Sequence, residues 1–166
     1  FYSFGAMLWD TIAESAPYYL IVKSSGNDRN DNISPSANDT HQVWISGSGW
    51  TQSTMQRAAD CPTGYDCIST NGNAKNILTV GAVNDISSGW QQASDVVMSS
   101  FSGWGPTDDG RIKPDIVGNG VSLFSSGSAN NTDYYNSSGT SMSAPNVTGS
   151  LALVQQHYLN LTGGFM

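Results

Sequence analysis

The chain has 166 residues, a net charge of −7 and only 11% charged side chains, so it is long enough for one domain with a hydrophobic core. The acidic balance argues against binding to nucleic acid or to an anionic membrane surface, because both need a basic face. No run approaches the ~20 apolar residues of a membrane span, and no signal-peptide pattern is visible.

The first elements are predicted to be a helix and a buried strand. Phe4, Leu8 and Ile12 recur at helical spacing within residues 3–15. Residues 18–22, YYLIV, then form an unbroken apolar run, which is typical of a parallel strand buried on both faces. A helix followed by a buried strand is half of an α/β unit, so we expect an α/β fold with a mainly parallel sheet flanked by helices.

The middle of the chain alternates polar stretches with short strands. Residues 24–60 are rich in Ser, Gly, Asn, Asp and Trp, and are expected to form loops or short strands. Residues 77–83, ILTVGAV, predict a second buried strand. After the polar stretch 84–114, residues 115–117 and 121–124 predict two more short strands.

The two cysteines, Cys61 and Cys67, are separated by a short spacer that contains Pro and Gly and can therefore turn back on itself. We favour a small disulfide loop over two free thiols. Two ligands without a nearby His make a poor zinc site. A disulfide, low charge and abundant Gly, Ser and Asn favour a secreted, extracellular protein.

The last element is predicted to be a helix with the clearest periodicity in the chain, ended by Gly163. Its apolar positions are Val147, Leu151, Val154, Tyr158 and Leu161.

The start of this helix offers a hydroxyl beside an anion site. Thr140 and Ser141 are both good N-cap residues, and Pro145 is tolerated in the first turn. First-turn N–H groups lack intrahelical partners and can hold a negative charge, which is what an acyl-transfer nucleophile needs. Gly139 lets a substrate approach closely. The alternative is that Thr140 and Ser141 only cap the helix.

Three separated segments of the sequence are similar to segments of one enzyme family. Residues 139–145, GTSMSAP, resemble the signature around the nucleophile of the subtilisin-like serine proteases, peptidase family S8. Residues 99–106, SSFSGWGP, with 110–117, GRIKPDIV, resemble the family's segment between its later core strands. Residues 20–27, LIVKSSGN, resemble the strand that delivers an oxyanion-hole amide. The resemblance implies a partial subtilisin-like three-layer fold and peptide-bond hydrolysis through an acyl-enzyme.

The resemblance also implies roles for individual residues. Ser141 would be the nucleophile, and its backbone N–H together with the Asn27 side-chain amide would hold the oxyanion. Ser24, Ser25 and Gly26 would line the pocket for the substrate residue before the scissile bond. Asn27 follows a buried strand, at the edge of a parallel sheet where α/β sites assemble. From the residues alone, however, it is interpreted as a turn Asn in Gly-Asn-Asp.

The catalytic base expected from the resemblance has no matching residue in this sequence. His157 lies on the same helix as Ser141, about 24 Å along its axis. His41 stands in no family-like context and is interpreted as a loop histidine. Asp10 and Asp115 do not fit the family's aspartate context either.

We therefore interpret residues 1–166 as the C-terminal portion of a catalytic domain, with the nucleophile and oxyanion-hole part but without the Asp and His part. We expect this portion to be inactive alone. The expected partners are a polypeptide substrate and the missing N-terminal part. The portion should associate or have low stability, because the edges of its parallel sheet would be exposed.

No cofactor is assigned, although calcium is possible at residues 28–32 or 108–110. Neither segment has the alternating oxygen ligands of a calcium loop, so solvated turns are favoured.

Two other functions are open on the sequence alone. One is a non-catalytic extracellular binding module, a β-sandwich with Trp50, Trp90 and Trp104 on one face. The other is a pseudo-protease whose full-length chain lacks the Asp and the His.

Overall fold

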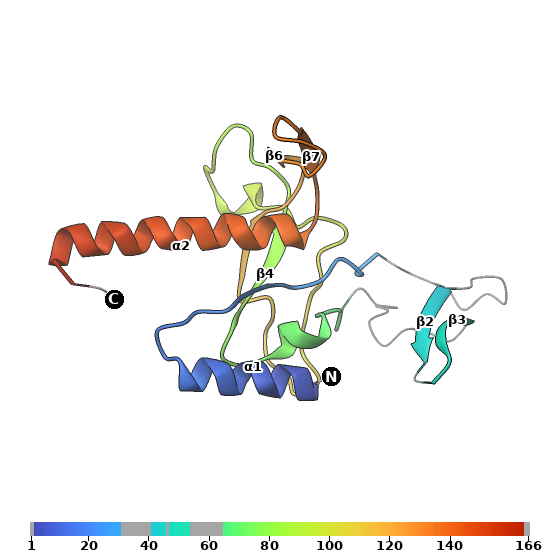
Figure 1. Cartoon of the computed structure of the whole chain (residues 1–166). Helices are drawn as coiled ribbons and strands as arrows, with labels where there is room; N and C mark the ends of the chain where they lie inside the picture. The colour runs from blue at the N-terminus through green and yellow to red at the C-terminus, as the bar shows by residue number, and fades with distance from the viewer. Residues whose placement is uncertain (1, 31–40, 46, 54–64, 165–166) are drawn as a thin grey trace.

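The computed structural model describes residues 2–30, 41–45, 47–53 and 65–164. Its centre is a three-stranded parallel sheet in the order β1 (Val22–Ser24), β4 (Leu78–Val83) and β5 (Ile116–Asn119). Helix α2 (Thr140–Thr162) packs on all three strands, and helix α1 (Phe4–Ser15) lies on the opposite side of the sheet (Figure 1). The expected α/β architecture with a parallel sheet flanked by helices is therefore confirmed.

Two antiparallel hairpins and two short 3-10 helices complete the described elements. They are β2 (His41–Ile45), β3 (Gly49–Ser53), η1 (Thr70–Asn73), η2 (Ala93–Asp95), β6 (Leu123–Ser126) and β7 (Tyr134–Ser137). The β6–β7 hairpin stands above the start of α2, whereas β2–β3 lies away from the sheet (Figure 1).

The prediction of a buried strand at residues 77–83 is confirmed, since β4 contains the most buried run of the sheet. The prediction for residues 18–22 is wrong over most of its length. Strand β1 begins only at Val22, while Tyr18 is 96% and Tyr19 61% exposed. An unbroken apolar run forms a buried strand only where other elements cover both faces of the strand. Here the described residues cover neither Tyr18 nor Tyr19.

Helix α1 forms where it is predicted, but its apolar stripe does not face the core. Phe4, Leu8 and Ile12 are exposed, whereas Ala6 and Asp10 are buried. The buried Asp10 carboxylate accepts hydrogen bonds from the Tyr2 hydroxyl (2.6 Å) and from the backbone N–H groups of Lys75 (2.7 Å) and Asn76 (2.6 Å). Hydrogen bonding to the loop before β4 therefore fixes the buried face of α1.

Asp10 should contribute stability that depends on pH. Burial opposes its ionisation, but the hydrogen bonds from Tyr2, Asn76 and Lys75 outweigh burial and hold the pKa of Asp10 below its ordinary value. The stabilisation is present above the unfolded pKa near 3.8 and is lost as the pH falls through the lower, folded pKa.

We expect Asp10→Ala to lower the free energy of unfolding by about 2–3 kcal/mol at pH 7, measured by urea denaturation, because two backbone donors lose their acceptor. The loss should shrink as the pH falls below 3.8 and through the lower, folded pKa. Glu14→Ala, on the same helix, is the control. A loss that stays the same throughout this acid range would contradict the role given to the carboxylate.

Helix α2 approaches the sheet closely over its first two turns. A side chain at Gly118 would come within 2.8 Å of the Val147 side chain, so glycine at this position allows the close contact. Val147 is buried, but the rest of the predicted apolar stripe is not. Val154 is 55% and Leu161 73% exposed. The helix is thus confirmed, whereas burial along its whole length is not.

Cys67 is buried and disulfide-bonded. Because Cys61 lies outside the described residues, the pairing of Cys61 with Cys67 stays a prediction. No helix in the described part of the chain is long and apolar enough to cross a membrane. Across the described ranges no cluster of three or more His, Cys, Asp or Glu side chains could hold a metal, and residues 31 and 32 of the possible calcium segment lie outside them.

Candidate active site

Ser141 occupies the first turn of α2 and is exposed. The N-cap is Gly139, with φ near +155°, rather than Thr140 or Ser141 as expected from the sequence. The Gly139 N–H donates to the Gly120 carbonyl (2.8 Å), so the end of β5 holds the start of the helix. The hydroxyls of Thr140 and Ser141 therefore do not cap the helix from the N-cap position. Ser141 lies at the start of the helix without a capping role.

Asn27 supplies the cap from a distant part of the chain. Its side-chain oxygen Oδ1 accepts from the Thr140 N–H (2.9 Å) and from the Thr140 hydroxyl (2.8 Å). The Thr140 hydroxyl in turn accepts from the Gly26 N–H (3.3 Å). These bonds join the carboxyl end of β1 to the residue immediately before Ser141, across more than a hundred positions of sequence.

These two hydrogen bonds also determine which atom of the Asn27 side-chain amide is free to bind a substrate. Because Oδ1 is directed at Thr140, the Nδ2 amide group is the donor that remains. Nδ2 lies 3.5 Å from the point where a Cβ at Gly139 would stand, so glycine keeps this space open. The first-turn N–H of Ser141 has no intrahelical acceptor. Two donors therefore lie at the same positive helix end, where developing negative charge is favoured.

Residues Ser24, Ser25 and Gly26 form the segment that connects β1 to Asn27, called the 24–26 segment below. Ser25 is fully buried, and its backbone carbonyl accepts from the Ser69 N–H (2.7 Å). Gly26 has φ near +112°, which disfavours any side chain, and its carbonyl accepts from the Gly103 N–H (2.9 Å). Hydrogen bonds from two other loops therefore hold the 24–26 segment in place.

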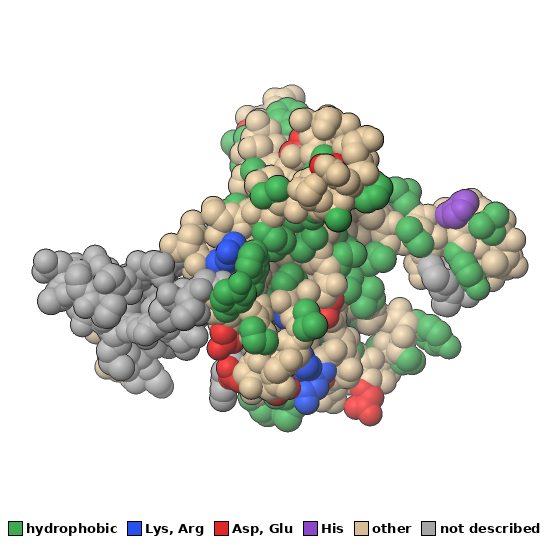
Figure 2. All heavy atoms as spheres, turned by 180° about the vertical axis from the view of Figure 1, so that it is seen from behind, with side chains coloured by type: hydrophobic (Ala, Val, Ile, Leu, Met, Phe, Trp, Pro, Cys, Tyr) green, Lys and Arg blue, Asp and Glu red, His purple; other side chains and the backbone are tan. Residues whose placement is uncertain are grey.

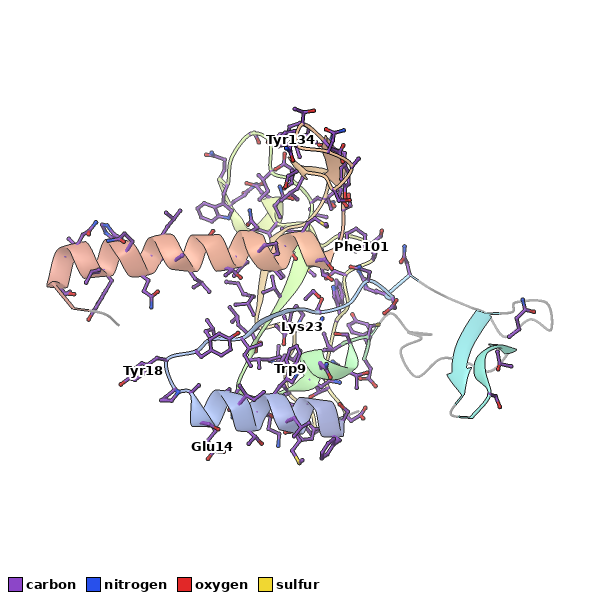
Figure 3. The ribbon with its side chains drawn as sticks, viewed as in Figure 1. Trp9, Glu14, Tyr18, Lys23, Phe101 and Tyr134 are labelled. Carbon is purple, nitrogen blue, oxygen red and sulfur yellow. The ribbon has the colours of Figure 1, made fainter. Side chains whose placement is uncertain are left out.

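A pocket of about 300 Å³ opens beside Ser141, between the β6–β7 hairpin and the first turns of α2. Figure 3 shows Tyr134 on this hairpin, above the start of the helix. The pocket is lined by Leu123, Phe124, Ser125, Ser126, Tyr135, Ser137, Ser141, Met142, Pro145 and Asn146. None of these side chains is His, Asp, Glu or Lys, so the described part of the lining offers Ser141 no group that takes up a proton near neutral pH.

The candidate acids and bases whose side chains the structure describes lie elsewhere. The Asp115 carboxylate accepts from the buried Lys113 ammonium (2.6 Å) and from the Thr79 N–H (2.7 Å), which is a structural role at the start of β5. His157 lies far along α2 from Ser141. His41 begins β2, and its side chain lies outside the described residues.

Two features of this site are not predicted from the sequence. Thr140 was expected only as a cap, yet its hydroxyl links Gly26 to Asn27. Phe124 and Tyr135 were not singled out, although they line the pocket beside Ser141. No motif marks them, because a hairpin position becomes a pocket wall only through its packing against α2.

Comparison with known proteins gives one family. The family model described as the subtilase family matches residues 3–164. The C5a peptidase of Streptococcus pyogenes serotype M3 (strain ATCC BAA-595 / MGAS315) is 43% identical over 86 residues, 52% of this chain and 7% of that protein. Serine protease AprX of Bacillus subtilis (strain 168) is 35% identical over 107 residues, 57% of this chain and 24% of that protein. This chain thus spans less than a quarter of the length of both relatives.

A solved structure of the PatG macrocyclase in complex with peptide superposes with a TM-score of 0.54 at 18% identity. It covers 92% of this chain and 32% of the PatG chain, and supports the fold alone. The family match covers the whole described sheet and both α-helices, and this chain belongs to the subtilase family.

Proposed function

We propose that this chain is the C-terminal portion of the catalytic domain of a subtilisin-like serine endopeptidase, with Ser141 as nucleophile. The observation that carries the proposal is the pair of hydrogen bonds from Thr140 to the Asn27 side chain, at 2.9 and 2.8 Å. They bring an amide donor beside a serine at a helix start, and these are the two parts that acyl transfer needs from this chain.

In the proposed reaction the Ser141 oxygen attacks the carbonyl carbon of a peptide bond. Its proton passes to a general base, and the carbonyl oxygen becomes an oxyanion held by the Ser141 N–H and by Asn27 Nδ2. The C–N bond then breaks, the amine leaves with the proton from the base, and an ester on Ser141 remains. Attack by water on this ester releases the carboxylic acid and restores the hydroxyl.

The 24–26 segment would line the pocket for the substrate residue that precedes the scissile bond. Its side chains are small, and it ends at Asn27, next to the position proposed for the reacting carbonyl.

The general base would come from polypeptide outside residues 1–166. The uncharged lining of the pocket beside Ser141 supports this, as does the placement of Asp115 in an ion pair with Lys113. A serine hydroxyl is a poor nucleophile without a base, so the 166-residue chain alone should be inactive. The disulfide at Cys67 supports a secreted protein that acts in an oxidising, extracellular setting.

The alternative of a binding module receives no support from the described residues. They form a helix-flanked parallel sheet and no β-sandwich. Trp104 is enclosed by the guanidinium of Arg29, 3.5 Å from its ring centroid, and by the edge of Tyr65.

The proposal is tested by supplying a base. The part of AprX that precedes the region matched by this chain would be fused before residue 1, and the fusion is called the AprX chimera below. We expect the chimera to hydrolyse a fluorogenic peptide, while the 166-residue chain remains at background. Robust hydrolysis by the isolated chain contradicts the need for an external base, and a folded but inactive chimera contradicts the catalytic roles given to Ser141 and Asn27.

A further inference from the structure

Asn27 lies on a stretch of backbone that belongs to no helix or strand. Its side chain is exposed, and its Oδ1 accepts two hydrogen bonds from Thr140. Gly26, directly before it, has φ near +112°, and glycine gives the backbone more conformational freedom than any other residue. The Nδ2 donor can therefore keep one position beside Ser141 only if other contacts fix the backbone that bears it.

A second segment of the chain holds this backbone on both sides of Asn27. The Gly103 N–H donates to the Gly26 carbonyl (2.9 Å), one residue before Asn27. The Arg29 N–H donates to the Phe101 carbonyl (3.3 Å), two residues after Asn27. The two bonds run in opposite directions between the same two segments, so the residue that bears the amide donor lies between two points of attachment.

The Arg29 side chain adds a further contact with the same segment. Its guanidinium carbon Cζ lies 3.5 Å from the centroid of the Trp104 ring, which is a close cation–π contact. The Tyr65 ring meets Trp104 edge-on, with centroids 5.6 Å apart and ring planes at 60°. Trp104 therefore provides an aromatic surface on which Arg29 stacks, two residues beyond Asn27.

Trp104 is itself held by the neighbouring backbone. Its carbonyl accepts from the N–H of the disulfide-bonded Cys67 (2.7 Å). Directly before it, a Cβ at Gly103 would lie 2.5 Å from the Cys67 carbonyl oxygen and 2.9 Å from the Ser25 carbonyl oxygen, so the two backbones are in direct contact. Close packing thus fixes Trp104, and a side chain that stacks on its ring is fixed in turn.

The basic side chains of this chain are few, and those with printed partners make local contacts. The sequence has six Lys and Arg against thirteen Asp and Glu, and Figure 2 shows the basic groups of the rear face in separate places rather than in one patch. Arg111 pairs with Asp109, and Lys113 pairs with Asp115. The contact of Arg29 with Trp104 is local in the same sense, and it joins the loop that bears Asn27 to a fixed segment.

We infer that Arg29 is a positioning residue of the proposed active site, whose stacking on Trp104 holds Asn27 so that Nδ2 stays beside the Ser141 N–H. The inference rests on the proposed function, because Arg29 acts through the oxyanion donor. Such donors are effective when they are preorganised, and a small misplacement of a catalytic group costs up to about 10²-fold in rate. Loosening Asn27 should therefore weaken oxyanion stabilisation and leave the rest of substrate binding intact.

The first test is kinetic and uses the AprX chimera. We expect Arg29→Ala to lower kcat about tenfold at a nearly unchanged KM, because Asn27 is still present but is held less firmly. This loss is smaller than the ~10²–10³ that follows removal of such a donor. Arg29→Lys keeps a cation that can lie over the Trp104 ring, and it should restore most of the lost kcat.

A double-mutant cycle separates positioning from a general structural role. If Arg29 acts through Asn27, Arg29→Ala should cause no further loss of kcat in a chimera that already has Asn27→Ala. A defect elsewhere in the fold would lower kcat by the same factor in both backgrounds. Lys75→Ala is the matched control, since it removes the second cation–ring contact of the described residues, 4.9 Å from the Tyr2 centroid, and it should leave kcat unchanged. Circular dichroism establishes that every variant is folded.

The second test measures how firmly Asn27 is held, without catalysis. The Thr140 N–H donates to Asn27 Oδ1, so its hydrogen exchange depends on the position of the Asn27 side chain. Mass spectrometry of the peptide that covers Thr140 measures this exchange in the same chimera variants. We expect Arg29→Ala to speed the exchange about tenfold and Lys75→Ala to leave it unchanged.

The outcomes separate the positioning role from the proposed function. Faster exchange at Thr140 in Arg29→Ala supports the positioning role even if the chimera hydrolyses nothing, in which case only the proposed function fails. An active chimera that keeps full kcat in Arg29→Ala overturns the inference, and so does a loss that is equal with and without Asn27 or that Arg29→Lys does not restore. In an inactive chimera, unchanged exchange at Thr140 overturns it as well.

Discussion

Ser141→Ala should abolish peptide hydrolysis by the AprX chimera, with kcat lower by about 10⁶, which is the loss measured for the nucleophile of subtilisin, a member of this family. The physical reason is that the acyl-enzyme needs the Ser141 oxygen, and the two oxyanion donors alone give only weak catalysis. Initial rates with a fluorogenic peptide and mass spectrometry after treatment with a fluorophosphonate would measure the two consequences, turnover and covalent labelling.

The matched control is Ser150→Ala, which removes another exposed serine hydroxyl from the same helix. That hydroxyl donates to the Asn146 carbonyl (3.0 Å) and has no role in the proposed reaction. Ser150→Ala should therefore retain both turnover and labelling. Fluorophosphonate labelling at a residue other than Ser141, or turnover that survives Ser141→Ala, would remove Ser141 from the mechanism.

The sequence predicts those parts of the fold that local patterns determine. The run at 77–83 is buried on both faces because β4 has a strand on each side and helices above and below, so its composition reports its surroundings correctly. Val147 and Tyr158 belong to one helical stripe, but only Val147 meets the sheet in this chain. Periodicity predicts which side of a helix is apolar, and it does not say what covers that side.

The site is predictable only as far as its motifs extend. The resemblance around residues 139–145 gives Ser141, and the end of β1 gives Asn27. The bonds from Thr140 to Asn27 join positions more than a hundred residues apart, and nothing in the composition of either segment reports their contact. The buried position of Asp10 was missed for the same reason, since its partners belong to a distant loop.

Asn27→Asp should separate the structural role of this residue from its catalytic role. A carboxylate keeps an oxygen to accept from the Thr140 N–H and hydroxyl, so the start of α2 remains capped and the fold is retained. The amide donor is lost, and a negative charge stands where the oxyanion would form. We expect kcat of the AprX chimera to fall by at least about 10²–10³, the loss measured when this donor is removed from subtilisin.

Two comparisons make this experiment decisive. The first uses Asn130, which has the same bonding pattern in an exposed turn, since its Oδ1 accepts from the Thr132 N–H (2.9 Å) and hydroxyl (2.8 Å). Asn130→Asp therefore controls for the change of charge and should leave kcat unaltered. Asn27→Ala should lower kcat similarly and also destabilise the fold by about 1–2 kcal/mol, because Thr140 loses its acceptor. If Asn27→Asp retained full kcat with an unchanged melting temperature, Asn27 would be only a helix cap, and the oxyanion would need another donor beside Ser141.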